Sequence, residues 1–118
     1  MKLLSLLCLV FLIACSKPDE TSPTILIVSP QQNEVFASGQ TITIKATIMD
    51  NNSIHMVHTI VTDKSGGHWV HSEEHTDGKN YNINKAFTVL SGKTYTIHID
   101  ATDHNKNITE KEITVSAN

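Results

Sequence analysis

Alternation of apolar and polar residues is the feature that most limits what this chain of 118 residues can fold into. In residues 41–48 the side chains of Ile42, Ile44, Ala46 and Ile48 fall on one side of an extended chain, and threonine or lysine falls on the other. A period of two is typical of a half-buried antiparallel strand. No stretch shows a helical period, so the sequence predicts an all-β domain. Further strands are expected at residues 24–28, 54–63, 68–73, 81–89, 94–101 and around 113–115.

About seven short strands at a spacing of roughly ten residues favour an antiparallel Greek-key sandwich. Two stretches resemble bacterial immunoglobulin-like domains. The first, ILIVSPQQNEVFASGQTITIKATIMD, has an edge strand, a Ser-Pro break and a glycine before the second strand. In the second, SGKTYTIHIDATDHNKN, Tyr95 lies where these domains place the tyrosine of a tyrosine corner. The resemblance covers residues 24–118 and implies an immunoglobulin-like sandwich, without the disulfide and buried tryptophan of antibody domains.

The N-terminus predicts a secretory signal peptide over residues 1–14. Lys2 is followed by an apolar run of eleven residues, 3–13, interrupted only by Ser5, which is too short for a membrane-spanning helix of about 20 residues. Leu12-Ile13-Ala14-Cys15 resembles the lipobox of bacterial lipoproteins, in which the signal is cut before an acylated cysteine. The resemblance implies lipidation of Cys15, so palmitate-type acyl chains would hold the protein at a membrane. The alternative is an ordinary signal peptide that leaves Cys15 as a free thiol.

Residues 15–23 then form a polar tether between the lipidated cysteine and the sandwich. Together the lipobox and the strand pattern are similar to small immunoglobulin-like lipoproteins of Bacteroidetes. We therefore expect a cell-envelope protein anchored by its lipid to a bacterial membrane, on the periplasmic or surface face of the outer membrane. Its expected partners are that membrane and a protein or glycan. All nine basic residues are lysines and the net charge is −3, which argues against a nucleic-acid partner.

Seven histidines are the one unusual count in the composition. If residues 64–67 close a symmetric hairpin, Val61 pairs with Val70 on the core face, and Asp63 pairs with His68. His58 then lies opposite Glu73 on the outer face, where Trp69 is expected too. A zinc or copper site could form there across three strands; alternatively, the histidines are ordinary surface residues that never converge. A cluster would also respond to pH near 6. The candidate ligands are His58, His71, His75, His98, Glu73 and Met56.

Two loops at one end of the sandwich carry hard oxygen ligands of the kind that Ca²⁺ takes. The residues concerned are Asp50, Asp100, Asp103 and Asn105. No complete calcium-loop spacing is present, so the favoured interpretation is that these side chains end their strands through local hydrogen bonds.

The sequence contains no motif that supports an enzyme. The sequence has no GxSxG, HExxH, P-loop or GxGxxG motif, and a small sandwich leaves little room for a deep pocket. The favoured function is a lipid-anchored binding or interaction module without catalytic activity. The alternative is a transition-metal-binding lipoprotein that uses the histidine patch.

Overall fold

The computed structural model describes residues 17–118, so the predicted signal peptide and the predicted lipidation of Cys15 lie outside the described residues. Eight strands make up the described fold, and no helix occurs within it. Residues 17–118 therefore contain no helix long and apolar enough to cross a membrane. The strands are β1 (Thr24–Ser29), β2 (Val35–Phe36), β3 (Thr41–Met49), β4 (Ile54–Asp63), β5 (His68–His75), β6 (Asn80–Thr88), β7 (Thr94–Asp103) and β8 (Ile108–Ala117).

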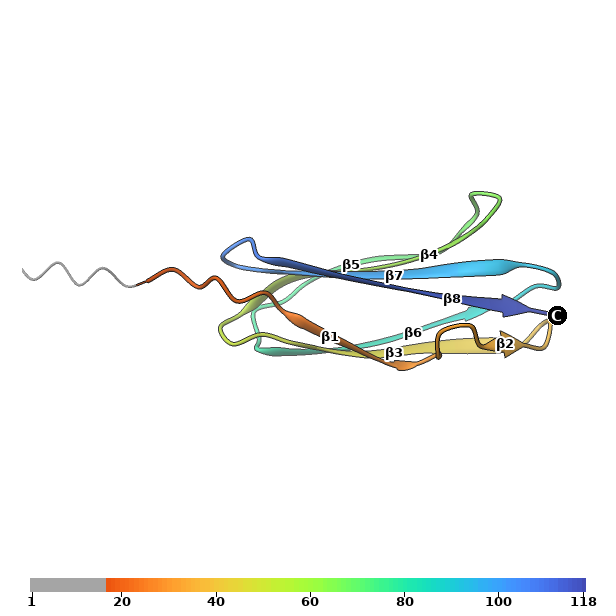
Figure 1. The fold of residues 1–118 in the computed structure, drawn as a ribbon, viewed down its shortest axis with the longest axis horizontal. Helices are drawn as coiled ribbons and strands as arrows, with labels where there is room; N and C mark the ends of the chain where they lie inside the picture. Colours follow the sequence, from red (N-terminus) through yellow and green to blue (C-terminus); the bar gives the residue numbers. More distant parts are fainter. Residues whose placement is uncertain (1–16) are drawn as a thin grey trace, which may run out of the picture.

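The strands form two sheets that face each other as a sandwich (Figure 1). The smaller sheet has the order β1-β3-β6, and the larger has the order β2-β8-β7-β4-β5. All pairs are antiparallel except β2 with β8. The expected all-β sandwich is confirmed. The two-residue strand β2 is an addition, because two residues are too few to show an alternation.

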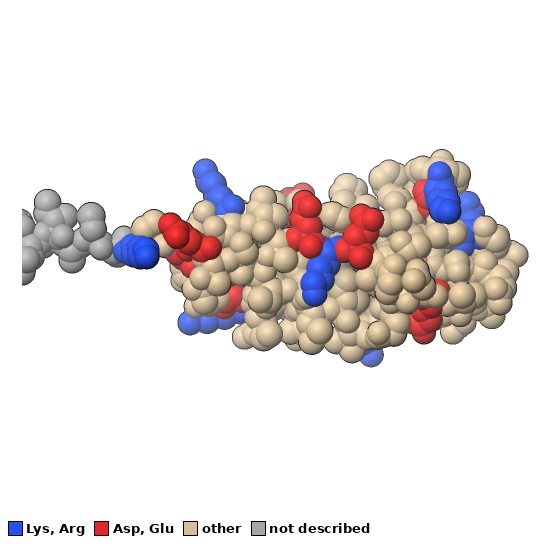
Figure 2. All heavy atoms as spheres, viewed as in Figure 1, with Lys and Arg blue, Asp and Glu red and all other residues tan. Residues whose placement is uncertain are grey.

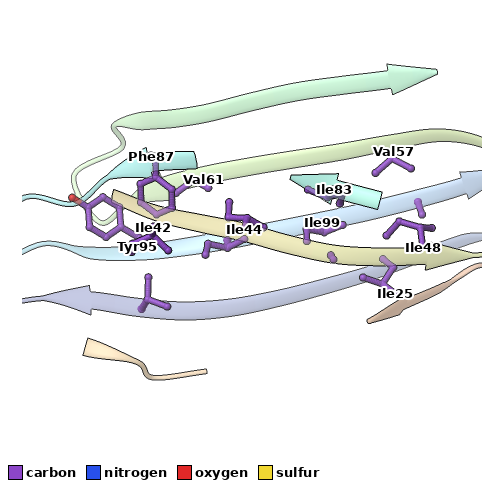
Figure 3. Packing of buried hydrophobic residues seen from close by; sticks show 14 of the residues in the cluster. Ile25, Ile42, Ile44, Ile48, Val57, Val61, Ile83, Phe87, Tyr95 and Ile99 are labelled. Atoms are coloured by element: carbon purple, nitrogen blue, oxygen red, sulfur yellow. The ribbon is translucent and has the colours of Figure 1, made fainter. Parts of the chain in front are cut away.

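The core lies between the sheets and comes from the alternation seen in the sequence (Figure 3). Ile44 and Ile48 of β3 and Ile97 and Ile99 of β7 have no exposed surface. Burying a side chain of this size is worth about 1.5–3 kcal/mol relative to leaving it exposed. Packing of the smaller sheet, which contains β3, against the larger sheet, which contains β7, covers these apolar faces.

Tyr95 anchors one end of this core. Its ring is fully buried and packs edge-on against Phe87 and Trp69, with each pair of ring centres 5.3 Å apart. The Tyr95 hydroxyl accepts a hydrogen bond of 2.8 Å from the backbone N–H of Leu90. This bond joins the turn before β7 to the core, as the resemblance to a tyrosine corner implied.

The β4–β5 hairpin follows the predicted register for most of its length and then departs from it. Val61 pairs with Val70 and His58 with Glu73, but a shift between Val61 and Thr62 makes Thr62, not Asp63, the partner of His68. Trp69 is left without a partner at this shift, and its ring packs against Tyr95. The expectation that Trp69 lies on the outer face is therefore wrong, because one extra residue in a strand turns a side chain toward the other face.

The sandwich has two distinct ends. Residues 17–23 reach it at the end formed by the β3–β4 and β7–β8 loops, which we call the tether end (Figure 1). Strand β4 begins there with Ile54 beside Asp103 and finishes at the opposite end with Asp63 beside Tyr95. The β4–β5 hairpin and the C-terminus lie at that second end, which we call the far end.

Candidate functional site

Histidines and carboxylates alternate across the outer face of the five-stranded sheet. His58 of β4 stands between two acids, with its Nδ1 2.9 Å from Asp100 Oδ1 and its Nε2 3.1 Å from Glu73 Oε2. The row continues on both sides of these three residues, over β5, β4, β7 and β8. We call this row the histidine–carboxylate ladder, and its members in order are His75, Glu73, His58, Asp100, His98 and Glu112.

The two sides of the ladder are held differently, closely on the side of β5 and more loosely on the side of β8. His75 Nε2 lies 2.9 Å from Glu73 Oε1, so Glu73 receives an imidazole on each carboxylate oxygen. His98 lies 3.6 Å from Asp100 and 3.5 Å from Glu112, which is ion-pair range but long for a hydrogen bond. The order of the row follows from the pairing of β4 with β5 and β7, which places Glu73 and Asp100 directly opposite His58.

The ladder favours the protonated form of His58. Both ring nitrogens face carboxylate oxygens, and only the imidazolium can donate on both sides. Burial alone lowers the pKa of His58, but the hydrogen bonds to Glu73 and Asp100 and their charges outweigh it and raise the pKa above its ordinary value. The pKa of Glu73 is lowered in turn, first by its hydrogen bond with His58 and then by that with His75.

The structure places the six predicted transition-metal ligands on this face but does not gather them. Met56 pairs with His75 in the sheet, and His71 pairs with Ile60. Neither the Met56 nor the His71 side chain takes part in a polar contact of the ladder. The carboxylate of Glu73 lies between His58 and His75, and that of Asp100 lies between His58 and His98. Zinc or copper binding therefore remains a prediction, for which this geometry provides paired imidazoles and acids but no closed set of four ligands.

Two further histidines extend the histidine surface toward the tether end. The ring of His55 lies 5.6 Å from that of His75 and 4.7 Å from that of His104, measured between ring centres. His104 Nε2 also lies 2.9 Å from Asp77 Oδ1. Sequence reasoning missed His55, because a register shift between Ile54 and Met56 interrupts the alternation. His104 lies in a loop, where alternation gives no signal.

The predicted calcium residues divide between two places. Asp100 belongs to the ladder, while Asp50 and Asp103 meet at the tether end. As expected, both end their strands through local hydrogen bonds: Asp50 Oδ2 accepts from the N–H of Asn52, and Asp103 Oδ1 accepts from the N–H of Asn105. Asn105 donates that backbone N–H to Asp103.

A third acid at the tether end, Asp19, was missed by sequence reasoning. Asp19, Asp50 and Asp103 each offer a carboxylate oxygen, and the three oxygens lie within 4.8 Å of one another. Within residues 17–118 this is the one group of three or more histidine, cysteine or acidic side chains with that spacing. Asp19 lies in the irregular tether, far in sequence from both partners, so no pattern could place it beside them.

The far end is organised by a single buried carboxylate. Asp63 accepts hydrogen bonds from the backbone and hydroxyl of Ser65, from Trp69 Nε1 at 2.9 Å and from Lys93 Nζ at 3.0 Å. The Ser65 bond, followed by those of Trp69 and Lys93, holds the pKa of Asp63 far below its ordinary value. An open depression of about 350 Å³ lies beside it, lined by Asp63, Lys64, Ser65, Gly92, Lys93 and Thr94.

Two facing sheets that are antiparallel apart from the short β2, a tyrosine corner and loops gathered at two ends define an immunoglobulin-like β-sandwich. Residues 23–99 match the family model described as bacterial Ig domain, and the chain belongs to that family.

Among solved structures, the chain is similar to the sporulation control protein Spo0M from Bacillus subtilis, with a TM-score of 0.42 and 9% identity. That match covers 82% of this chain and 49% of the other, so the chain spans about half the length of that protein. A comparison with curated proteins found no match.

Proposed function

We propose that the protein is a lipid-anchored interaction module of the bacterial cell envelope, without catalytic activity, which holds a protein or glycan partner near a membrane. The observation that carries this proposal is the place where the tether joins the sandwich. Residues 17–23 reach the tether end, and Cys15 lies only two residues before them. Acyl chains on Cys15 would therefore leave the far end pointing away from the membrane.

The far end has the features of a contact surface rather than a reaction site. Asp63, its buried carboxylate, already accepts hydrogen bonds from five donor groups and carries a strongly lowered pKa, so it is a poor proton acceptor. Lys64 and Lys93 line the open depression beside it. A shallow, polar surface with lysines suits a macromolecular partner better than a small substrate, which needs a deep apolar pocket.

Anchoring is tested by replacing each of the two cysteines in turn. In a bacterial host, Cys15→Ser is expected to abolish incorporation of a labelled fatty acid and to release the protein from the membrane fraction. The matched control is Cys8→Ser, which is expected to keep both the label and the membrane location. Equal labelling of Cys15→Ser and the unchanged chain would refute the anchoring proposal.

The contact surface is tested by photocrosslinking in intact cells. A photoreactive residue at the exposed position Ser65, at the far end, is expected to form a discrete crosslinked species. The same residue at the exposed position Asn52, at the tether end, is the matched control and is expected to form none. Crosslinking from Asn52 alone would show that the tether end, and not the far end, contacts the partner.

A second candidate function, transition-metal binding, is favoured by one observation in the ladder. Nε2 of His58 and Nε2 of His75 both contact the carboxylate of Glu73, so two imidazoles and one acid lie together. Zinc accepts this ligand set with a fourth position open. Titration with zinc or copper is expected to show binding that the double change His58→Ala with His75→Ala removes and that His68→Ala, outside the ladder, leaves intact. Equal binding by all three proteins would exclude the ladder as the site.

A further inference from the structure

We propose that Asp19, Asp50 and Asp103 bind one Ca²⁺ ion at the tether end, and that this ion fastens the tether to the sandwich. The three acids come from separate parts of the chain: the tether, the residue after β3 and the last residue of β7. The fold alone brings their oxygens within 4.8 Å of one another. Acidic side chains gather beside the point where the described chain leaves the sandwich (Figure 2).

Two of these carboxylates have oxygens that the protein does not satisfy. Asp50 is 8% exposed, and its Oδ1 is buried without a hydrogen-bond partner. Oδ2 of Asp19 is also buried and without a partner. A buried polar atom is normally hydrogen-bonded, and a buried charge is normally paired with an opposite charge or a metal ion. A cation bound between these carboxylates would satisfy both oxygens.

No side chain among residues 17–118 forms a salt bridge that supplies that positive charge. The salt bridges among residues 17–118 involve other acids, and none includes Asp19, Asp50 or Asp103. Asp103 is 1% exposed, so solvent does not screen the cluster fully. Asp19 Oδ1 accepts hydrogen bonds of 3.0 Å from the backbone N–H of Thr21 and from Asn51 Nδ2, and these bonds hold the tether carboxylate beside the other two acids.

The chemistry of the donors favours calcium over other metals. All three ligands are carboxylates, with no imidazole or thiolate among them, so zinc and copper are disfavoured. Asn107 Nδ2 donates hydrogen bonds to the backbone oxygen of Asp19 at 3.1 Å and to Asp103 Oδ2 at 2.7 Å, so the Asp19 backbone oxygen also lies near the cluster. Ca²⁺ takes six to eight oxygens from irregular loops, whereas Mg²⁺ demands a strict octahedron and keeps several waters.

The ion would strengthen a contact that the protein alone makes weakly. The tether is held at this end by three side-chain hydrogen bonds: Asn51 Nδ2 to Asp19 Oδ1 at 3.0 Å, Asn107 Nδ2 to Asp19 O, and the Thr109 hydroxyl to Pro23 O. A shared cation replaces the repulsion between Asp19 and the two loop acids with a common attraction. The site itself does not depend on lipid anchoring, since all of its ligands lie within residues 17–118.

Calorimetric titration of the full chain with CaCl₂, after removal of calcium with a chelator, tests the site. We expect one Ca²⁺ per chain with a Kd below 1 mM, weaker binding of Mg²⁺, and at least a tenfold increase in Kd for Asp19→Asn and Asp50→Asn. The matched control is Asp77→Asn, which makes the same charge change at the same end and is expected to bind normally. Asp19 is only partly buried, so Asp19→Asn keeps the test valid even if Asp50→Asn fails to fold.

Proteolysis tests the link to the tether. An endoprotease specific for glutamate is expected to cleave between Glu20 and Thr21, and saturating Ca²⁺ is expected to slow this cleavage at least tenfold in the unchanged chain but not in Asp19→Asn. No binding at 10 mM CaCl₂, equal binding by all variants, or preference for Mg²⁺ would overturn the calcium site. Binding without any change in cleavage would overturn the fastening of the tether.

Discussion

Replacing Tyr95 with phenylalanine removes one oxygen atom from the core and leaves the ring contacts in place. The ring is fully buried against Phe87 and Trp69, and phenylalanine fills the same space. The backbone N–H of Leu90 then loses its hydrogen-bond acceptor, the Tyr95 hydroxyl oxygen, which lies 2.8 Å away in the unchanged protein. A polar group left without its partner costs about 1–3 kcal/mol, whereas the ring change alone is almost neutral. We therefore expect Tyr95→Phe to lower the free energy of unfolding by about 1–3 kcal/mol.

Urea unfolding, followed by the fluorescence of Trp69, measures this change directly. Trp69 is the one tryptophan of the chain, and its ring centre lies 5.3 Å from that of Tyr95, so its signal reports on this end of the core. For a domain of this size, each kcal/mol lowers the melting temperature by about 4–8 °C. The slope of unfolding against urea should stay unchanged, because the buried area is unchanged.

The second tyrosine provides the control. Tyr81 is half-buried, and its hydroxyl makes no hydrogen bond with another group of residues 17–118, so Tyr81→Phe is expected to change stability by less than about 0.5 kcal/mol. If Tyr95→Phe is as stable as Tyr81→Phe, the bond to Leu90 does not hold the turn, and the reasoning fails.

Three further changes test the core, the ladder and a turn. Ile44 has no exposed surface, so Ile44→Ala is expected to lower the free energy of unfolding by about 2–5 kcal/mol, measured with denaturant. The control is Leu26→Ala, at a residue that is 58% exposed, which is expected to lower it by less than about 0.5 kcal/mol. Similar losses at both positions would contradict the assigned core. His58 has a raised pKa, so the stability it adds is present below its unfolded pKa and is lost as the pH rises through its folded pKa. The difference in unfolding free energy between wild type and His58→Gln should thus be larger at about pH 5.5 than at about pH 8.5, and a difference independent of pH would speak against the ladder. Gly92 has φ +72° with open space around it, so Gly92→Ala should cost about 1–2 kcal/mol from backbone strain alone, and a neutral result would refute that conformation.

Alternation predicted the sheets well because it reports directly which face of each strand is buried. The pairing of Val61 with Val70 and of His58 with Glu73 follows from that signal and from the length of the hairpin loop. The register failed at Thr62, where the loop closes on the carboxylate of Asp63 through bonds to Ser65 and Gly67. Such bonds depend on side-chain geometry, which a period of two does not contain.

The candidate site was predictable to the same depth. Alternation in β7 puts His98 and Asp100 on one face, and this pattern could have moved Asp100 from the predicted calcium set to the ladder. That the imidazoles meet acids rather than one another depends on rotamers, which only coordinates show. Asp19 reaches Asn107, 88 residues away, from a segment without regular structure, and no local pattern carries that information.

The position of β1 determines how the domain would respond to mechanical load. β1 is the first strand after the tether, and its backbone pairing with β3 runs from Thr24 opposite Met49 to Ser29 opposite Lys45. A pull between the tether and the far end acts along β1, while the backbone hydrogen bonds between β1 and β3 lie across it. Such a force shears all of these backbone hydrogen bonds at once instead of breaking them one after another. The strand nearest the anchor is therefore arranged to withstand tension.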